Sequence, residues 1–309
     1  MKQPKVYAIV LHWNTYEDTK ECLLSLQKTA YDNYEVVLVD NGSDDNSGFR
    51  LRDEYPECHF IRNDDNLGYP EGNNVGIRYA MEKNADYVVL LNSDIIVDPD
   101  YLAELVNVAE SDEQVGIVGS KVLFYHERNV IQTAGGKINW WLGRIKNYGG
   151  PDTGQYDEIM ERDYVYGTCM LIKRKVIERI GGLDPQFFFS IEEYDYCPRA
   201  SNAGFKTMYA PKSRIWHKKG ASAKKLGDRP DTLALISRKA GLLMWRYYWK
   251  LFKKHLPAPL YIVPFVACML KLLFVVSKRI LSDLFRGNVK PLRFAIDRIW
   301  YRMKLALRL

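Results

Sequence analysis

The sequence predicts an α/β fold in which a doubly wound, mostly parallel sheet is flanked by helices and followed by a basic helical tail. Three observations support this prediction. Apolar runs of strand length alternate with helical stretches over residues 5–110. The connections between them are short, as they are in successive βα units. Beyond residue 237 the charge becomes strongly positive and the pattern becomes helical and amphipathic.

The first part of the chain supplies the parallel sheet. Apolar runs predict buried strands over residues 5–11, 35–40, 59–62 and 87–91. Between them, amphipathic stretches predict helices over residues 17–28 and about 72–83. Ligands of such a sheet bind beyond the carboxyl ends of its strands, so the residues that follow each strand are the candidates for chemistry.

The second part is less regular. A helix is expected from Asp100 to Glu110 and a strand over residues 116–119, followed by a Gly- and Trp-rich stretch over 124–164 that we interpret as a functional loop. The pattern then predicts a strand over 164–172, a helix over 173–180, and an acidic segment over 192–199. Two short strands are expected to bracket Pro211.

Charge divides the chain into an acidic body and a basic tail. Residues 238–309 contain 16 Lys and Arg against 2 Asp and Glu, a net charge of +14. The remaining 28 basic and 36 acidic residues give the body −8. In the tail the cations alternate with aromatic residues such as Trp245 and Trp249, which favours an anionic lipid surface over nucleic acid as its partner.

The apolar run over residues 260–276 is shorter than a membrane span of about 20 residues and contains Pro264 and Lys271. We therefore expect helices that lie in the membrane interface. The alternative is a helical hairpin that packs on the body or on a second subunit, which would make the protein a homodimer.

Cysteine usage and the N-terminus favour the cytoplasm. The five cysteines are scattered singly, without a CxxC pair, which argues against a disulfide framework and a structural zinc site. The segment MKQPKVYAIVLHWN has too short an apolar run for a secretory signal.

Two aspartates follow predicted strands. Asp40, in VDNGSDD, suits either a turn or helix cap or a carboxylate that accepts from a pyrimidine imide N–H. Asp94, in LLNSDIIVDPD, comes just after an apolar strand, where a divalent metal would offset the desolvation of its charge. Asp98 and Asp100 fit better as start signals for the next helix.

A third acidic group, Glu192, Glu193 and Asp195, follows three phenylalanines in FFFSIEEYDYC. Burial and mutual repulsion should raise the pKa of at least one of these carboxyls toward the range of a general base, although acids also favour a helix N-terminus through its dipole. His217, in IWHKKGAS, is either a satisfied core or surface histidine or part of a site for an anionic phosphate.

Taken in order, these segments resemble glycosyltransferase family 2, and in particular its rhamnosyltransferase-like members, which have the GT-A type fold. The matching segments cover most of residues 5–222 and are VLHWNTYEDTKECLLSL, VVLVDNGSDDNS, RNDDNLGYPEGNNVGIRYA, ADYVVLLNSDIIVDPDYL, YVYGTCMLIKRKVI, GGLDPQFFFSIEEYDYCPRASNAGFK and IWHKKGAS. The resemblance implies a catalytic domain over residues 1–230, with a nucleotide-binding half over about 1–120 and an acceptor half over about 121–230. The tail over 231–309 lies outside it.

The resemblance also implies roles for single residues. Asp40 would recognise the uracil or thymine of a nucleotide-sugar donor, in a pocket lined or shaped by Asn14, Asn66, Gly68 and Asn73. Asn92-Ser93-Asp94 stands where the family has its DxD-like motif, so Asp94 would bind Mg²⁺ or Mn²⁺ with help from His217. Gly167 corresponds to the small residue near the donor sugar and the acceptor.

Two positions depart from the family pattern. Glu193 inherits the role of catalytic base, although the family has Asp there, so the carboxylate stands on an arm one methylene longer. Pro198 falls where the helix of the motif should continue, so it marks either the first turn of a late helix or a kink in an early one.

The function expected from these residues and the resemblance is transfer of a sugar from a UDP- or dTDP-sugar to a hydroxyl of a lipid-linked or surface glycan, at the cytoplasmic face of the membrane. Inversion at the anomeric carbon is implied by the family resemblance alone. Trp140, Trp141 and Tyr148 are candidates for stacking on acceptor sugars or for packing beneath their loop. Two other functions are open: a sugar nucleotidyltransferase, and a family member that binds nucleotide or membrane without catalysis.

Overall fold

The structure is a computed structural model that describes residues 3–218, 246–267 and 270. The described residues form two compact units. One contains residues 3–138 and 145–218, and the other contains residues 139–144, 246–267 and 270. The predicted domain boundary at 230/231 lies outside the described residues.

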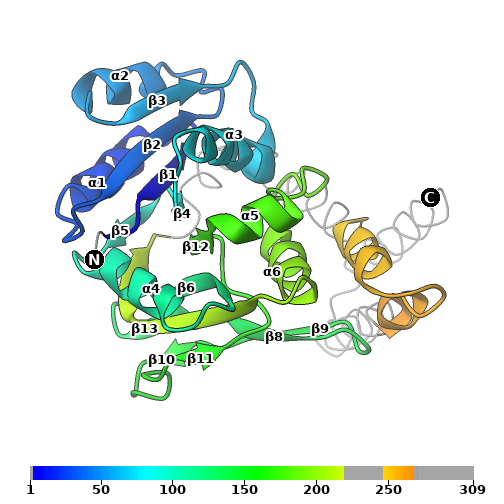
Figure 1. Cartoon of the computed structure of the whole chain (residues 1–309). Coiled ribbons are helices and arrows are strands. Elements are labelled where there is room, and N and C mark those ends of the chain that lie inside the picture. Colours follow the sequence, from blue (N-terminus) through cyan, green and yellow to red (C-terminus); the bar gives the residue numbers. More distant parts are fainter. Residues whose placement is uncertain (1–2, 219–245, 268–269, 271–309) are drawn as a thin grey trace, which may run out of the picture. The chain divides into compact units, whose positions relative to one another are not determined.

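The first unit is built on one mixed sheet whose main strand order is β10-β7-β6-β12-β4-β1-β2-β3 (Figure 1). Its parallel part consists of β1 (Val6–His12), β2 (Tyr34–Asp40), β3 (His59–Arg62) and β4 (Tyr87–Asn92). These are the four predicted strands, and β1 lies between β2 and β4. The predicted fold class, a mostly parallel sheet flanked by helices, is confirmed.

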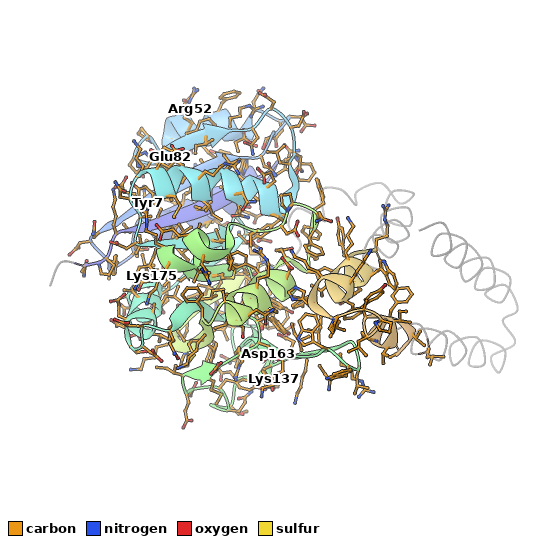
Figure 2. All side chains as sticks on the ribbon, turned by 45° about the vertical axis from the view of Figure 1, so that its right-hand side comes forward. Tyr7, Arg52, Glu82, Lys137, Asp163 and Lys175 are labelled. Atoms are coloured by element: carbon orange, nitrogen blue, oxygen red, sulfur yellow. The ribbon has the colours of Figure 1, made fainter. Side chains whose placement is uncertain are left out.

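Helices cover both faces of this parallel part. Ala8 and Val10 of β1 pack in a common core with Cys22 and Leu23 of α1 (Tyr16–Leu26). On the opposite face, Ile9 faces α3 (Gly68–Glu82). A Cβ on Gly76 of α3 would lie 2.6 Å from the Ile9 side chain, so glycine is required for this close approach of helix to strand. In Figure 2, Tyr7 of β1 and Glu82 at the end of α3 mark these elements.

Two more helices accompany the parallel strands. α2 (Ser47–Glu54) was not predicted, because its sequence SGFRLRDE is largely polar and only Leu51 provides a fully buried apolar side chain. α4 (Tyr101–Glu110) agrees with the prediction and packs against β6 and β13.

The second half of the sheet contains antiparallel pairs. β12 (Cys169–Lys173) runs antiparallel to both β4 and β6 (Val115–Phe124), while β13 (Lys206–His217) runs parallel to β6 and antiparallel to β5 (Ile95–Val97). The two strands expected around Pro211 are in fact the single strand β13. Its register with β6 shifts between Ala210 and Arg214, and this irregularity accommodates the proline.

The stretch expected to be an irregular loop contains several short strands: β7 (Val130–Thr133), β8 (Gly136–Asn139), β9 (Arg144–Asn147), β10 (Gly150–Pro151) and β11 (Met160–Glu161). The strand expected from residue 164 begins at Cys169 instead. α5 (Arg174–Ile180) and α6 (Glu192–Asn202) follow, and Pro198 lies inside α6, so the helix begins early.

In the second unit, residues 246–255 and 262–267 are helical. Trp249 packs edge-on against Phe265, with ring centroids 4.6 Å apart. Within residues 3–218, 246–267 and 270, we find no helix that is long and apolar enough to cross a membrane. The predicted tail residues 231–245, 268–269 and 271–309 lie outside the described residues.

Candidate active site

The two predicted metal ligands meet at one edge of the sheet. Asp94 lies in the turn between β4 and β5, and the pairing of Ile95 with His217 brings the end of β13 beside it. The His217 Nε2 atom lies 3.1 Å from the Asp94 Oδ1 atom, and the Lys218 N–H donates to the Asp94 carbonyl at 2.9 Å. Both side chains are buried, with exposed fractions of 11% and 9%.

Gln132 orients this histidine. The His217 Nδ1 atom lies 2.8 Å from the Gln132 Oε1 atom, and an amide oxygen can only accept. Nδ1 therefore carries a hydrogen, and in the neutral ring the lone pair is on Nε2, toward Asp94. Sequence reasoning missed Gln132, because it lies on β7 in the stretch expected to be irregular.

This pair suits a divalent cation held by few protein groups. No cluster of three or more His, Cys, Asp or Glu side chains able to hold a metal occurs in the part of the chain that the structure describes. One carboxylate and one imidazole leave most coordination positions to water and to a phosphate ligand, which is how Mg²⁺ is commonly held, and Mn²⁺ accepts the same donors.

Lys218 is directed away from that pair. Its Nζ atom lies 2.8 Å from both the Asp18 and the Glu21 carboxylates of α1. Lys218, considered from the sequence as part of a phosphate site, thus anchors the end of β13 to α1, and Lys219 lies outside the described residues.

Asp40 lies at the carboxyl end of β2 and is fully buried. The Ser43 N–H donates to its Oδ1 atom at 3.0 Å, and the Arg62 guanidinium donates to Oδ2 and, at 2.9 Å, to the Ser43 carbonyl. A Cβ on Gly48 would lie 2.0 Å from Oδ2, so the following turn and α2 close tightly over this carboxylate. Arg62, which sequence reasoning missed, is its register partner on β3.

The other residues predicted for the nucleotide site include Asn14 and Asn66, which link the loop after β2 to the loops after β1 and β3. Asn14 adopts a positive φ of 53°; its N–H donates to the Ser43 hydroxyl at 3.0 Å, and its side-chain oxygen accepts from the Asp44 N–H at 3.1 Å. Asn66 accepts from the Gly68 N–H at 2.9 Å and from Asn41 at 3.0 Å. The loops after β1, β2 and β3 thus form one network.

Asn73 and Asn92 each present a buried side-chain oxygen without a hydrogen-bond partner in the structure. Asn73 is fully buried in α3 and uses its amide nitrogen on the Tyr69 carbonyl at 2.9 Å. Asn92 ends β4, where its N–H donates to the Thr168 carbonyl at 3.2 Å. A buried acceptor without a donor is unfavourable, so both positions favour a polar ligand.

The predicted base lies in the first turn of α6. Glu192 and Glu193 are only 7% and 9% exposed. Burial raises the pKa of Glu193 to about 7. Burial, together with the charge of Glu193, raises the pKa of Glu192 well above its ordinary value. The preceding Ser190 and Ile191 have φ values of +66° and +72°, a conformation that is strained for a β-branched residue and that recurs at functional sites.

Asp195 has a different environment. It is fully buried, and its Oδ2 atom accepts from the Arg199 Nε at 2.9 Å. Arg199 also donates to the Ile180 and Gly182 carbonyls, both at 2.8 Å. Through Arg199, Asp195 fixes α6 to the end of α5.

Gly167 and Thr168 connect the metal-ligand pair with the buried glutamates. Thr168 bonds to Asn92, two residues before Asp94. The adjacent Gly167 carbonyl accepts from the Tyr69 hydroxyl at 2.7 Å, and the charges of Glu192 and Glu193 contribute to raising the pKa of Tyr69. A Cβ on Gly167 would lie 3.0 Å from that hydroxyl, so a side chain at this position would crowd Tyr69.

Comparisons with known proteins identify the family of the chain. The sequence profile described as glycosyltransferase-like family 2 matches residues 4–229. The chain belongs to this glycosyltransferase family. The low-salt glycan biosynthesis hexosyltransferase Agl10 of Haloferax volcanii is 29% identical over 195 residues, which cover 62% of this chain and 60% of that protein.

A second family 2 relative is the N-acetylglucosaminyl-diphospho-decaprenol L-rhamnosyltransferase of Mycobacterium tuberculosis, which is 24% identical over 206 residues, or 60% of this chain and 67% of that protein. The chain spans 18% to 60% of the length of three curated relatives that it matches. Among solved structures, GalNAc-T7 with UDP, GalNAc and Mn²⁺ aligns with a TM-score of 0.58 at 20% identity, covering 69% of this chain and 44% of that one. This likeness confirms the GT-A type fold.

In this member of family 2 the buried Glu193 should reduce stability at neutral pH. The folded state raises its pKa from 4.5 to about 7, so the carboxyl ionises less readily when folded than when unfolded. The destabilisation is absent below about pH 4.5, grows as the pH rises, and is complete above about pH 7, where it amounts to about 3 kcal/mol. Glu193→Gln should therefore raise the free energy of unfolding by about that amount at pH 8 and change it little at pH 4.5.

Denaturant unfolding of the wild type and the variant at both pH values measures this difference. The conservative variant Glu178→Gln, at an exposed position paired with Arg174, serves as the control and should show no comparable dependence on pH. An equal change in the free energy of unfolding at the two pH values would contradict the raised pKa of Glu193.

Proposed function

We propose that this chain is a metal-dependent, inverting glycosyltransferase that moves a sugar from a UDP- or dTDP-sugar to a hydroxyl of a lipid-linked or surface glycan. The observation that carries the proposal is a chain of contacts: Thr168 bonds to Asn92, two residues before Asp94, and the adjacent Gly167 carbonyl accepts from Tyr69, whose pKa is raised by burial and by the charges of Glu192 and Glu193. The Asp94–His217 pair offers ligands for a cation that binds diphosphate, and Glu193 offers a base.

On the donor side, Asp40 is proposed to read the pyrimidine. Uracil and thymine share an imide N–H, and a carboxylate has about four lone-pair positions, of which Ser43 and Arg62 use two. Asn14 and Asn66 hold the loops around this group, and the acceptor oxygens of Asn73 and Asn92 remain for donor groups of the ligand. Asp94 and His217 would hold Mg²⁺ or Mn²⁺, which when bound would neutralise charge on the leaving diphosphate.

On the acceptor side, Glu193 is proposed to take the proton of the attacking hydroxyl. A base with a pKa of about 7 is largely ionised slightly above neutral pH and still holds a proton well. The oxygen then forms its bond to the anomeric carbon from the side opposite the diphosphate, whose bond to that carbon breaks. Burial and the charge of Glu193 both raise the pKa of Glu192, which favours a shared arrangement with the proton on Glu192 and the charge on Glu193.

The M. tuberculosis relative is named for transfer to a lipid diphosphate. By analogy, and because the tail is basic and rich in aromatic residues, we propose a saccharide on a lipid carrier as the acceptor. Peripheral binding of the tail would place the enzyme at the cytoplasmic face of the membrane.

The test is a donor screen with the full chain. Purified protein is incubated with Mn²⁺ or Mg²⁺ and a panel of UDP- and dTDP-sugars, with and without a lipid extract, and release of nucleoside diphosphate is measured. We expect metal-dependent release from one donor that increases with the extract. Pyrophosphate release from a nucleoside triphosphate and a sugar phosphate would instead indicate a nucleotidyltransferase, and nucleotide binding without turnover of any donor would indicate a non-catalytic family member.

A further inference from the structure

The tip of the β8–β9 hairpin belongs to the C-terminal unit. Residues 139–144, called the hairpin tip from here on, cluster with residues 246–267 and 270, although they lie in the middle of the sequence that matches the family. Trp140 of the tip stacks on His255, with ring centroids 4.9 Å apart and an interplanar angle of 23°. Trp140 is thus engaged in packing, which was one of the two roles expected for it.

The strands that lead to the tip have a defined conformation. The Ile138 N–H donates to the Asp163 carboxylate at 2.7 Å, and the Asp163 N–H donates to the Gly136 carbonyl at 3.0 Å. Figure 2 shows Asp163 and its neighbour Lys137 at this hairpin. The tip is therefore carried by a fixed hairpin and not by an irregular loop.

The hairpin tip exposes large apolar side chains. Trp141 is 58% exposed and Leu142 is 47% exposed. The same unit has a second group of exposed apolar side chains, called the apolar stripe: Ile262, Val263, Val266 and Leu270, each 44–61% exposed. Their spacing puts them on one side of a helix, whereas Phe265 packs on Trp249 and Pro264 is buried. The exposed side chains are thus additional to the packed core of the unit.

Cations accompany these apolar groups. Residues 246–270 contain Arg246, Lys250, Lys253 and Lys254 and no acidic residue, and Arg144 is exposed on the hairpin tip. Exposed aliphatic side chains, a tryptophan and several cations in a segment without acidic residues are the combination that binds the interface of an anionic bilayer. Binding to nucleic acid would use the cations but would leave the isoleucine, valine and leucine side chains in water.

We propose that the hairpin tip and the apolar stripe together form a surface that docks on an anionic lipid bilayer, with Trp141 and Leu142 entering the interface. The inference deepens the proposed function, since it assigns a membrane contact to a segment inside the catalytic sequence as well as to the tail. It also gives Trp141 a lipid partner instead of an acceptor sugar.

The test compares lipid binding of the full chain with that of Trp141→Ser/Leu142→Ser, using vesicles made of equal parts phosphatidylglycerol and phosphatidylcholine. Flotation should show at least about tenfold weaker partitioning of the double variant, because two large apolar side chains no longer enter the interface. The matched control is Ile159→Ser, which removes a 54% exposed apolar side chain from the other unit and should bind as the wild type does.

Three results would overturn the proposal: unchanged partitioning of the double variant, an equal loss in Ile159→Ser, or equally strong wild-type binding to vesicles of phosphatidylcholine alone. Donor hydrolysis in solution should be the same in the double variant and the wild type, which shows that the variant is folded. If no donor is hydrolysed by any of these proteins, near-ultraviolet circular dichroism replaces hydrolysis as the folding control. The lipid result then stands even if the proposed transferase activity fails.

Discussion

Asp94→Asn should lower kcat/KM for sugar transfer by roughly 10²–10³-fold, because it removes the carboxylate and leaves His217 alone of the two proposed ligands of the cation. The remaining activity should need a much higher concentration of Mn²⁺ for half-maximal rate. Measuring nucleoside diphosphate release against Mn²⁺ concentration checks both effects.

Gln132→Ala should cause a smaller loss of activity than Asp94→Asn. It keeps both proposed ligands and removes only the acceptor of the His217 Nδ1–H, so the loss should be smaller, about 10–100-fold, and should also shift the Mn²⁺ dependence. A rate for Asp94→Asn that falls without any change in Mn²⁺ dependence would show that Asp94 acts other than through a metal.

Glu193→Gln should reduce the rate of transfer by about 10²–10⁴-fold, since glutamine cannot take the proton of the acceptor hydroxyl. In the wild type the rate should rise with pH as the carboxyl ionises around pH 7 and then level off. The variant should lose this rise. Because Glu193→Gln is expected to stabilise the fold, its loss of activity cannot be attributed to unfolding.

Two further variants sharpen the assignment. Glu192→Gln should retain most of the activity, because burial and the charge of Glu193 raise the pKa of Glu192 and so favour its neutral form, which glutamine resembles. Glu193→Asp introduces the aspartate that the family has at this position, with a side chain one methylene shorter. Its rate relative to that of the wild type measures how strongly catalysis here depends on the position that glutamate gives the carboxylate. If Glu192→Gln were inactive and Glu193→Gln active, Glu192 and not Glu193 would be the base.

The pattern of apolar residues within each segment was sufficient to predict the parallel half of the sheet. A continuous apolar run such as residues 87–91 is satisfied only when both faces of a strand are covered, and β4 is indeed buried on both faces. The pattern did not predict elements whose structure depends on contacts with residues that are distant in sequence. α2 owes its place to Leu51 and the turn around Asp40, and β13 continues through Pro211 because a register shift removes the need for a ladder hydrogen bond there.

For the site, the amino-acid pattern was enough to indicate which side chains could take part, because polar residues that end apolar strands must gather at one edge of a parallel sheet. That reasoning was sufficient to select Asp40 and Asp94 as candidates. The pairing of Asp94 with His217 across 123 positions, the orienting contact from Gln132 and the bond from Arg62 to Asp40 became visible in the folded chain alone. Such contacts depend on strand register, and the pKa of Glu193 depends on how much water its neighbours exclude. Neither property is present in any single segment of the chain.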